Sequence, residues 1–231
     1  MFKIVSWTNY RKLNKTNNMK NLLVRCSELK NLMTKSRSKK EALSETTKSW
    51  IKEKVKEEFY GYRKKLDGDP INKGIDMEDL AIEMLNEITF NSYKKNQERK
   101  TNSWLTGEAD IVSKDTIEDI KCSFTLETFP AFAEDAYAAI KKAGYDWQLR
   151  GYMLLWNKPN AKVQYCMVST PDYIMKDWYN KDIHKVDKHE PTTRLTTVGI
   201  HRDEKLEDEM LEQYALANEY YKERWEEINN K

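Results

Sequence analysis

The chain has 231 residues and a net charge of +2, with 34% charged and 39% hydrophobic residues. This length suits one domain with a buried core, and no apolar run is long enough to cross a membrane. The three cysteines lack a CxxC spacing, which excludes a four-cysteine zinc or iron–sulfur site and favours a reducing compartment. Because the Lys- and Asn-rich start also lacks the apolar segment of a signal peptide, we expect a cytoplasmic protein.

The positive charge is concentrated at one end. Residues 1–65 carry 18 Lys and Arg against 6 Asp and Glu, a balance of +12, and the rest of the chain carries 22 against 32, a balance of −10. A surface that follows nucleic-acid phosphates has such a basic composition, but a solvated set of lysine-rich helices has it too. Charge alone therefore leaves both interpretations open.

Apolar periodicity and turn residues divide the chain into elements. Residues 1–20 are polar without periodicity and are interpreted as an N-terminal arm, and residues 21–231 as a single domain. The sequence predicts helices at 27–34 (with Ser27 as N-cap), 38–66, 74–90, 145–156 and 204–229, and strands at 108–121 (a hairpin), 162–171 and 194–203. Segments 126–144 and 173–186 stay ambiguous. This order predicts an α/β fold with a small mixed β-sheet flanked by helices, an N-terminal helical region and a long C-terminal helix.

The hairpin, in "GEADIVSKDTIEDIKCSF", contains charged residues that are unusual inside strands. A two-residue turn at Lys114–Asp115 would place Asp110 directly opposite Asp119, with Lys121 on the same face. Opposed like charges are destabilising unless a cation lies between them, and a hard divalent cation would fit. A three-residue turn would instead place Glu118 opposite Asp110, so this inference depends on the register.

A third carboxylate precedes the hairpin in "GIDMEDLAIEML". Glu78 lies on the edge of the apolar stripe of this helix, which is predicted to contain Leu80, Met84, Leu85 and Ile88. Asp79 and Glu83 point further outward. Glu78 could therefore reach inward toward a cation, although a surface glutamate would show the same pattern.

The order Glu78, Asp110 and Asp119-Ile120-Lys121 resembles the PD-(D/E)XK nuclease superfamily. "YDWQLRGYMLLW" places Gln148 and Tyr152 four residues apart on one helical face. This Q-x-x-x-Y helix is similar to that of the RecB-type, lambda-exonuclease-like branch. The residue before Asp110 is alanine rather than the proline of the family name.

Two further segments resemble phage alkaline exonucleases of the lambda and YqaJ type. "KGIDMEDLAIE" is similar to their K-G-x-x-x-E-x-x-A segment, which selects Glu78 over Glu83 as the first metal-binding carboxylate. "VRCSELKNLMT" is similar to the segment that binds the DNA 5′-phosphate, and it implies this role for Ser27 and, more weakly, for Arg25. The resemblance covers roughly residues 22–225.

The resemblance implies a Mg²⁺-dependent 5′ exonuclease acting on one strand of duplex DNA, with Mn²⁺ as a possible substitute. Its metal ligands would be the carboxylates of Glu78, Asp110 and Asp119 and the backbone carbonyl of Ile120, an all-oxygen set that suits these ions. Lys121 would orient or deprotonate the attacking water and offset phosphate charge, and the neighbouring carboxylates, which raise its pKa, favour orientation. Gln148 and Tyr152 would position DNA or the water. The histidines have no ligand spacing, and we expect them at the surface: His184, His189 and His201.

Relatives of this kind are phage-encoded proteins of the bacterial host cytoplasm that serve DNA recombination and repair. They form rings, which implies a homotrimer, and act beside a single-strand annealing protein. Two alternatives stay open. One is an endonuclease of the same superfamily, and the other is a DNA-binding module on an inactive nuclease fold, which would have no use for the acidic cluster.

Overall fold

The computed structural model describes residues 21–231, so the polar arm expected at 1–20 lies outside the described residues. Two compact units make up this part of the chain. One comprises 21–24, Asn31–Arg63 and Asp203–Lys231, and the other comprises Arg25–Lys30 and Lys64–Arg202. That residues 21–231 act as one nuclease domain stays a prediction.

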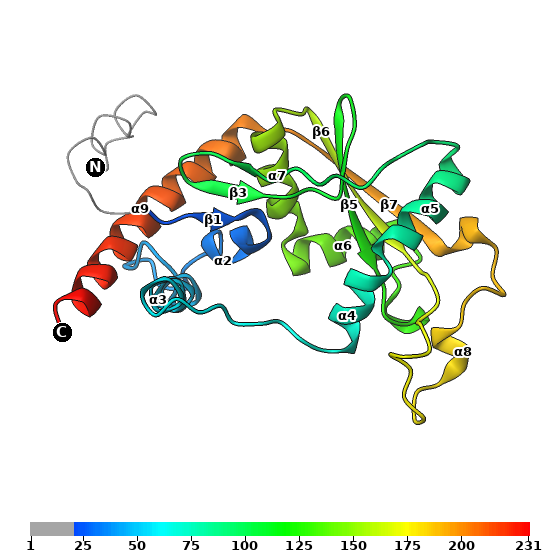
Figure 1. Ribbon diagram of the computed structural model, residues 1–231. Coiled ribbons are helices and arrows are strands. Elements are labelled where there is room, and N and C mark those ends of the chain that lie inside the picture. Colours follow the sequence, from blue (N-terminus) through cyan, green and yellow to red (C-terminus); the bar gives the residue numbers. More distant parts are fainter. Residues whose placement is uncertain (1–20) are drawn as a thin grey trace. The chain divides into compact units, whose positions relative to one another are not determined.

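The described chain contains both helices and strands (Figure 1). The helices are α2 (Leu29–Leu32), α3 (Glu45–Phe59), α4 (Asp69–Asp76), α5 (Glu78–Thr89), α6 (Ala133–Ala143), α7 (Tyr145–Trp156), α8 (Lys181–His184) and α9 (Glu204–Asn229). The strands are β1 (Val24–Arg25), β2 (Lys100–Thr101), β3 (Leu105–Gly107), β4 (Ile111–Val112), β5 (Thr116–Cys122), β6 (Asn160–Cys166) and β7 (Leu195–His201). Three short 3₁₀ turns are η1 (Cys26–Glu28), η2 (Leu126–Thr128) and η3 (Pro191–Arg194). This α/β composition with a long C-terminal helix confirms the predicted fold class.

The first unit is built on the packing of α3 against α9. Helix α3 begins after Ser44, whose hydroxyl accepts a hydrogen bond from the Thr47 backbone N–H at 3.0 Å. Such a cap satisfies one of the free N–H groups at a helix start. The apolar faces of both helices are buried, including Ile51, Val55, Tyr214 and Tyr221. The rest of the helix predicted at 38–66 is not helical, because α3 begins only after the Ser44 cap and ends at Phe59.

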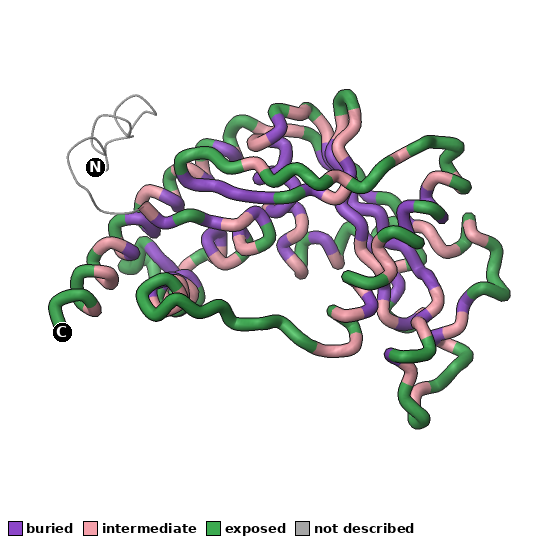
Figure 2. Tube along the Cα trace, in the orientation of Figure 1, coloured by how far each residue is buried: buried purple, intermediate pink, exposed green. Residues whose placement is uncertain are grey.

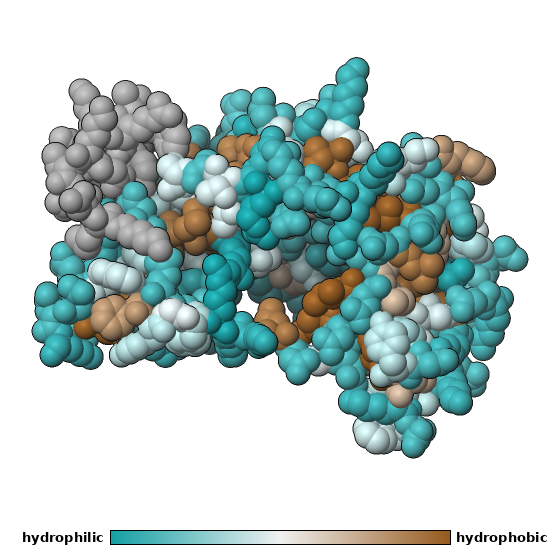
Figure 3. Space-filling view, viewed as in Figure 1, coloured by the Kyte–Doolittle hydropathy of each residue, from teal (hydrophilic) through white to brown (hydrophobic). Residues whose placement is uncertain are grey.

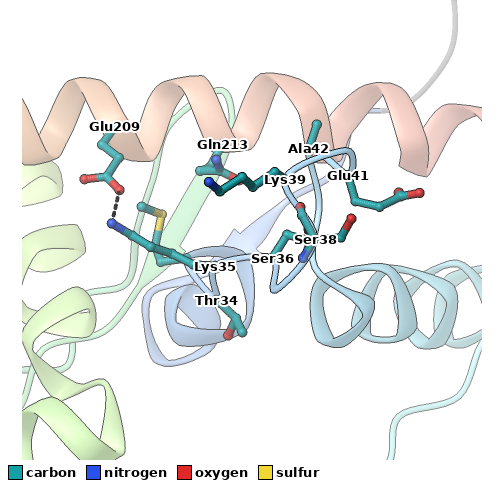
Figure 4. A pocket seen from close by; sticks show the side chains of 10 residues that line it. Thr34, Lys35, Ser36, Ser38, Lys39, Glu41, Ala42, Glu209 and Gln213 are labelled. Atoms are coloured by element: carbon teal, nitrogen blue, oxygen red, sulfur yellow. Dashed lines mark hydrogen bonds and ion pairs between the residues drawn. The ribbon is translucent and has the colours of Figure 1, made fainter.

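A pocket of about 260 Å³ also belongs to the first unit (Figure 4). The loop after α2 lines it with Ser38 and Lys39, and α9 contributes Glu209, which lies 3.6 Å from Lys35 Nζ. Surface ion pairs of this kind contribute little to stability. None of the residues selected from the sequence lines this pocket.

The second unit contains a four-stranded mixed sheet of order β4-β5-β6-β7 and a three-stranded sheet of order β1-β3-β2, and the boundary between the units falls within β1. Strands β5 and β6 are parallel, whereas β4 and β7 run antiparallel to their neighbours. Helices α6 and α7 connect the two parallel strands. Figure 2 shows that buried residues are concentrated along the central strands. Figure 3 shows many hydrophilic side chains on this face of the molecule, as expected from the high proportion of charged residues in the sequence.

Helices cover both faces of the four-stranded sheet. On one face, Ala81 and Leu85 of α5 form an apolar core with Ile111 and Ile120 of the hairpin. Asp119, the residue before Ile120 in β5, points to the opposite face because side chains alternate along a strand, and there it contacts α7 through Gln148. The hairpin therefore lies between α5 and α7.

Three predictions from the sequence are wrong in detail. Ser27 is not a helix N-cap, because it lies within the 3₁₀ turn η1, which Arg25 precedes as the N-cap residue. Leu80 is 47% exposed, and the buried stripe of α5 instead contains Ala81 and Ile82 beside Met84 and Leu85. His184 is buried, where it hydrogen-bonds Thr170 and stacks on Tyr179. None of the described helices is both long and apolar enough to cross a membrane.

Candidate active site

The register of the β4–β5 hairpin determines which carboxylates face each other. Ile111 pairs with Glu118 and Val112 with Ile117, and the Ser113 N–H donates to the Thr116 carbonyl at 2.9 Å. The turn therefore contains two residues, and continuing the ladder by one pair places Asp110 opposite Asp119. The alternative three-residue turn is excluded.

Asp119 is 1% exposed and is bound on both of its oxygens. Its Oδ1 accepts a hydrogen bond from Gln148 Nε2 at 2.9 Å, and its Oδ2 lies 2.6 Å from Lys121 Nζ as an ion pair. The same Gln148 nitrogen donates to the Tyr152 hydroxyl at 3.0 Å, across one turn of α7. Gln148 therefore supports Asp119 directly, and Tyr152 acts on Asp119 through Gln148.

Asp110 has an unusually basic carboxylate. Its Oδ2 accepts a hydrogen bond from the Ile120 N–H at 2.6 Å. Burial raises the pKa of Asp110 to about 8, and the charges of Asp119 and Glu78 add to this effect, while Lys121 and the Ile120 N–H oppose it. A raised carboxylate pKa shows that negative charge at this position is insufficiently balanced.

Lys121 supplies positive charge at this position. Burial acts to lower its pKa, but the carboxylates of Asp119 and Asp110 outweigh burial and raise the pKa above the ordinary value. Its ammonium also lies 4.5 Å from the centre of the Tyr145 ring of α7. Lys121 is therefore protonated at neutral pH, which suits a group that donates hydrogen bonds rather than one that removes a proton.

Glu78 is the first residue of α5 and forms an ion pair with a lysine. Its Oε1 lies 3.1 Å from Lys95 Nζ, which is also 3.4 Å from Asp79 Oδ1. Among residues 21–231, no group of three or more His, Cys, Asp or Glu side chains is arranged to hold a metal ion. Glu83 is exposed on α5, as expected. The structure thus brings together Asp110, Asp119, Lys121, Gln148 and Tyr152, and leaves Glu78 paired with Lys95.

The aspartate pair has the properties of an oxygen-ligand cation site. Asp119 Oδ2 is buried and contacts the Lys121 ammonium at 2.6 Å, with no further hydrogen-bond donor within the described chain. The Asp110 carboxyl opposite has a pKa of about 8. A hard divalent cation would bind the buried Asp119 oxygen and would stabilise the charged form of Asp110. These residues therefore fit Mg²⁺ or Mn²⁺. The participation of Glu78 and of the Ile120 carbonyl stays a prediction.

The segment that carries Ser27 packs on α7 and β3 at one glycine of each, Gly151 and Gly107. A Cβ on Gly151 would lie 2.6 Å from Leu29 Cδ1 and 2.9 Å from Cys26 Sγ, and one on Gly107 would lie 2.6 Å from that sulfur. Only glycine permits this approach, which holds η1 beside Tyr152. Ser27 is exposed, and Arg25 is half-buried in β1. Gly151, isolated within the helix predicted at 145–156, was the available sequence signal for this close packing.

Lys73 is a buried residue to which sequence reasoning assigned no role. It is 0% exposed, and its Nζ donates to the carbonyls of Ser123 at 2.8 Å and Phe124 at 3.0 Å. Burial lowers the pKa of Lys73 to about 8. Lys73 thus ties α4 to the chain just beyond the Asp119-Ile120-Lys121 strand. A lysine inside a short helical pattern looks solvent-exposed in sequence, so its burial could not be read there.

The free energy of unfolding of the wild-type protein should rise with pH in the alkaline range, and we expect Lys73→Met to abolish this rise. Between the native pKa near 8 and the ordinary value of 10.5, the unfolded chain binds a proton that the native chain has released. The free energy of unfolding therefore rises with pH in this window, by up to about 1.4 kcal/mol per unit. Urea unfolding at pH 7.5, 9 and 10.5 measures the slope. The exposed Lys94→Met should keep the wild-type slope, and equal slopes for all three proteins would contradict the assignment.

Glu118 is a second buried group that the sequence left outside the site. It is 1% exposed and faces away from Asp119, and its Oε2 accepts from Gln164 Nε2 at 2.6 Å. Thr197 in turn donates to Gln164 Oε1. This chain of hydrogen bonds crosses β5, β6 and β7 and balances a buried carboxylate beside the aspartate pair.

The mixed sheet with its Asp110/Asp119/Lys121 hairpin and the supporting Gln148 and Tyr152 of α7 define a nuclease core of the PD-(D/E)XK type. No protein-family model and no curated protein matches the sequence. Among solved structures, a phage-related exonuclease from Haemophilus somnus 129PT is 32% identical with a TM-score of 0.85, over 90% of this chain and 97% of that one. The chain belongs to the family of phage-related exonucleases.

More distant structures share the fold. The alkaline exonuclease LHK-Exo from Laribacter hongkongensis is 13% identical with a TM-score of 0.63, over 90% of this chain and 92% of that one. The same enzyme in complex with dAMP gives a TM-score of 0.61. These similarities confirm the predicted resemblance to alkaline exonucleases at the level of the fold.

Proposed function

We propose that this protein is a Mg²⁺-dependent exonuclease that hydrolyses one strand of duplex DNA from its 5′ end. The observation that carries the proposal is the register-defined pair of acidic residues, Asp110 and Asp119, with Lys121 beside them. Membership of the phage-related exonuclease family supports the activity. The dAMP complex of the Laribacter enzyme supports a deoxynucleoside monophosphate as the product class.

Each residue of the site has a distinct task in this proposal. Mg²⁺ held by Asp110 and Asp119, with Glu78 and the Ile120 carbonyl as further ligands, would neutralise the phosphodiester and stabilise the departing alkoxide. The Lys121 ammonium donates a hydrogen bond to the attacking water and offsets phosphate charge. Gln148 fixes the orientation of Asp119, and Tyr152 fixes Gln148.

The test is digestion of linear duplex DNA labelled on one strand, with either a 5′-phosphate or a 5′-hydroxyl, beside a covalently closed circle. Loss of the 5′-phosphorylated strand alone, with Mg²⁺ or Mn²⁺ and not with EDTA, is the expected result. Cutting of the circle would indicate an endonuclease instead. DNA binding without any cutting would indicate an inactive binding module.

We expect Ser27→Ala to reduce the preference for a 5′-phosphate while leaving the fold unchanged. The Ser27 side chain is exposed on η1, so the loss of its hydroxyl empties no part of the core. The measurement is the ratio of digestion rates on 5′-phosphate and 5′-hydroxyl ends. Ser103→Ala, at another exposed serine, should keep the wild-type ratio, and an unchanged ratio in the Ser27 variant would remove Ser27 from the proposed end-binding site.

The family resemblance also implies assembly, and we carry this into the proposal. A ring-shaped homotrimer that acts beside a single-strand annealing protein would keep the enzyme on one DNA end. Light scattering of the purified protein measures the first property, and co-elution with a candidate annealing protein measures the second.

A further inference from the structure

Glu78 already has a positively charged partner within the second unit. Lys95 Nζ lies 3.1 Å from Glu78 Oε1 and 3.4 Å from Asp79 Oδ1. The Glu78 side chain is 21% exposed and the Lys95 side chain 43% exposed. The ammonium is therefore at hydrogen-bonding distance from the carboxylate that the resemblance assigns to the metal.

The backbone on both sides of Lys95 is held in place. Two residues earlier, the Tyr93 N–H donates to Asn86 Oδ1 at 2.7 Å, and Asn86 Nδ2 donates to the Tyr93 carbonyl at 3.0 Å. One residue later, the Asn96 N–H donates to the carbonyl of Asp110 at 2.7 Å. Lys95 therefore does not extend from a loose loop, because the chain is anchored to α5 and to the acidic residue of the hairpin.

The Glu78–Lys95 ion pair affects how tightly a divalent cation can bind. The Lys95 ammonium is paired with Glu78, and the Asn96 N–H on the next residue binds the carbonyl of Asp110, so the ion pair lies on a segment attached to the aspartate pair. A divalent cation that recruits Glu78 must take the place of the Lys95 ammonium as its counter-charge. The free energy needed to break the ion pair is then subtracted from the free energy of cation binding.

We propose that Lys95 is a built-in competitor for the divalent cation, an ammonium that occupies the Glu78 carboxylate and thereby weakens cation binding. This inference rests on the proposed metal-dependent function. Lys95 is a positioning residue in this scheme, since it acts through Glu78. Because the pair is partly exposed, its removal should tighten cation binding by about two- to fivefold.

The experiment is Mn²⁺ binding to the DNA-free protein, followed by the electron paramagnetic resonance signal of the unbound ion. Wild type, Lys95→Met and Lys94→Met are compared at one ionic strength. Lys94 is the neighbouring exposed lysine, so its variant removes the same charge without the Glu78 contact. We expect the dissociation constant of Lys95→Met to fall about two- to fivefold, and that of Lys94→Met to stay at the wild-type value. Competition by Mg²⁺ should show the same order.

The outcomes separate this inference from the function on which it rests. If wild type binds Mn²⁺ and Lys95→Met binds it no more tightly than Lys94→Met does, the role of Lys95 is overturned and the nuclease proposal stands. If neither wild type nor Lys95→Met binds Mn²⁺, the metal-dependent function is overturned as well. Both exposed-lysine variants should keep the wild-type melting temperature, which confirms that binding is compared between equally folded proteins.

Discussion

Replacing Lys121 by methionine should lower the rate of DNA cleavage by about 10²- to 10⁴-fold, the usual contribution of a positioned proton-donating group. The ammonium lies 2.6 Å from Asp119 Oδ2 and is held protonated by Asp119 and Asp110. Methionine keeps the length of the side chain and loses its charge and hydrogen-bond donors. DNA binding should persist, because the phosphates of the duplex contact many other basic groups.

The measurement combines single-turnover cleavage in Mg²⁺ with DNA binding in Ca²⁺. Lys114→Met removes an equal charge at the exposed turn of the same hairpin. This control variant should cleave DNA at the wild-type rate. Undiminished cleavage by Lys121→Met would contradict the mechanism. Loss of both cleavage and binding would instead assign Lys121 to DNA recognition.

Asp110→Asn should abolish cleavage and, in the absence of metal, stabilise the fold at alkaline pH. The native pKa of Asp110 is about 8, whereas the ordinary value is 3.8. Below pH 4 the carboxyl is protonated in both the native and the unfolded chain. Between pH 4 and 8 only the native chain keeps the proton, so the stability of wild type falls as pH rises through this window. Asparagine is neutral throughout and avoids this loss.

The advantage of Asp110→Asn should therefore grow from pH 5 to pH 9, up to a few kcal/mol, since one pKa unit corresponds to about 1.4 kcal/mol. Urea unfolding in EDTA at pH 5, 6.5, 8 and 9 measures it. Asp115→Asn, at the exposed turn, should follow wild type at every pH. Saturating Mg²⁺ should stabilise wild type more than Asp110→Asn. An advantage that does not change with pH would contradict the raised pKa.

Local patterns in the sequence were sufficient for the hairpin and for two helices. The register followed from a two-residue turn and the alternation around Val112 and Ile117, both of which are short-range properties. The helices at 145–156 and 204–229 have the predicted bounds, because their start and stop signals are local as well. Local signals failed at Ser27, where a capping residue type occurs inside a 3₁₀ turn that packing against α7 imposes.

By itself, then, the sequence determined which residues carry the candidate chemistry and which face of its element each occupies, because strand alternation and helix periodicity depend only on neighbours. Only the tertiary structure decided which residues those faces contact. It placed Gln148 against Asp119 across 29 residues of chain and buried Lys73 beyond β5. It also paired Glu78 with Lys95. These contacts arise from packing α4, α5 and α7 around one sheet, and no local pattern encodes which charged side chain will be enclosed by that packing.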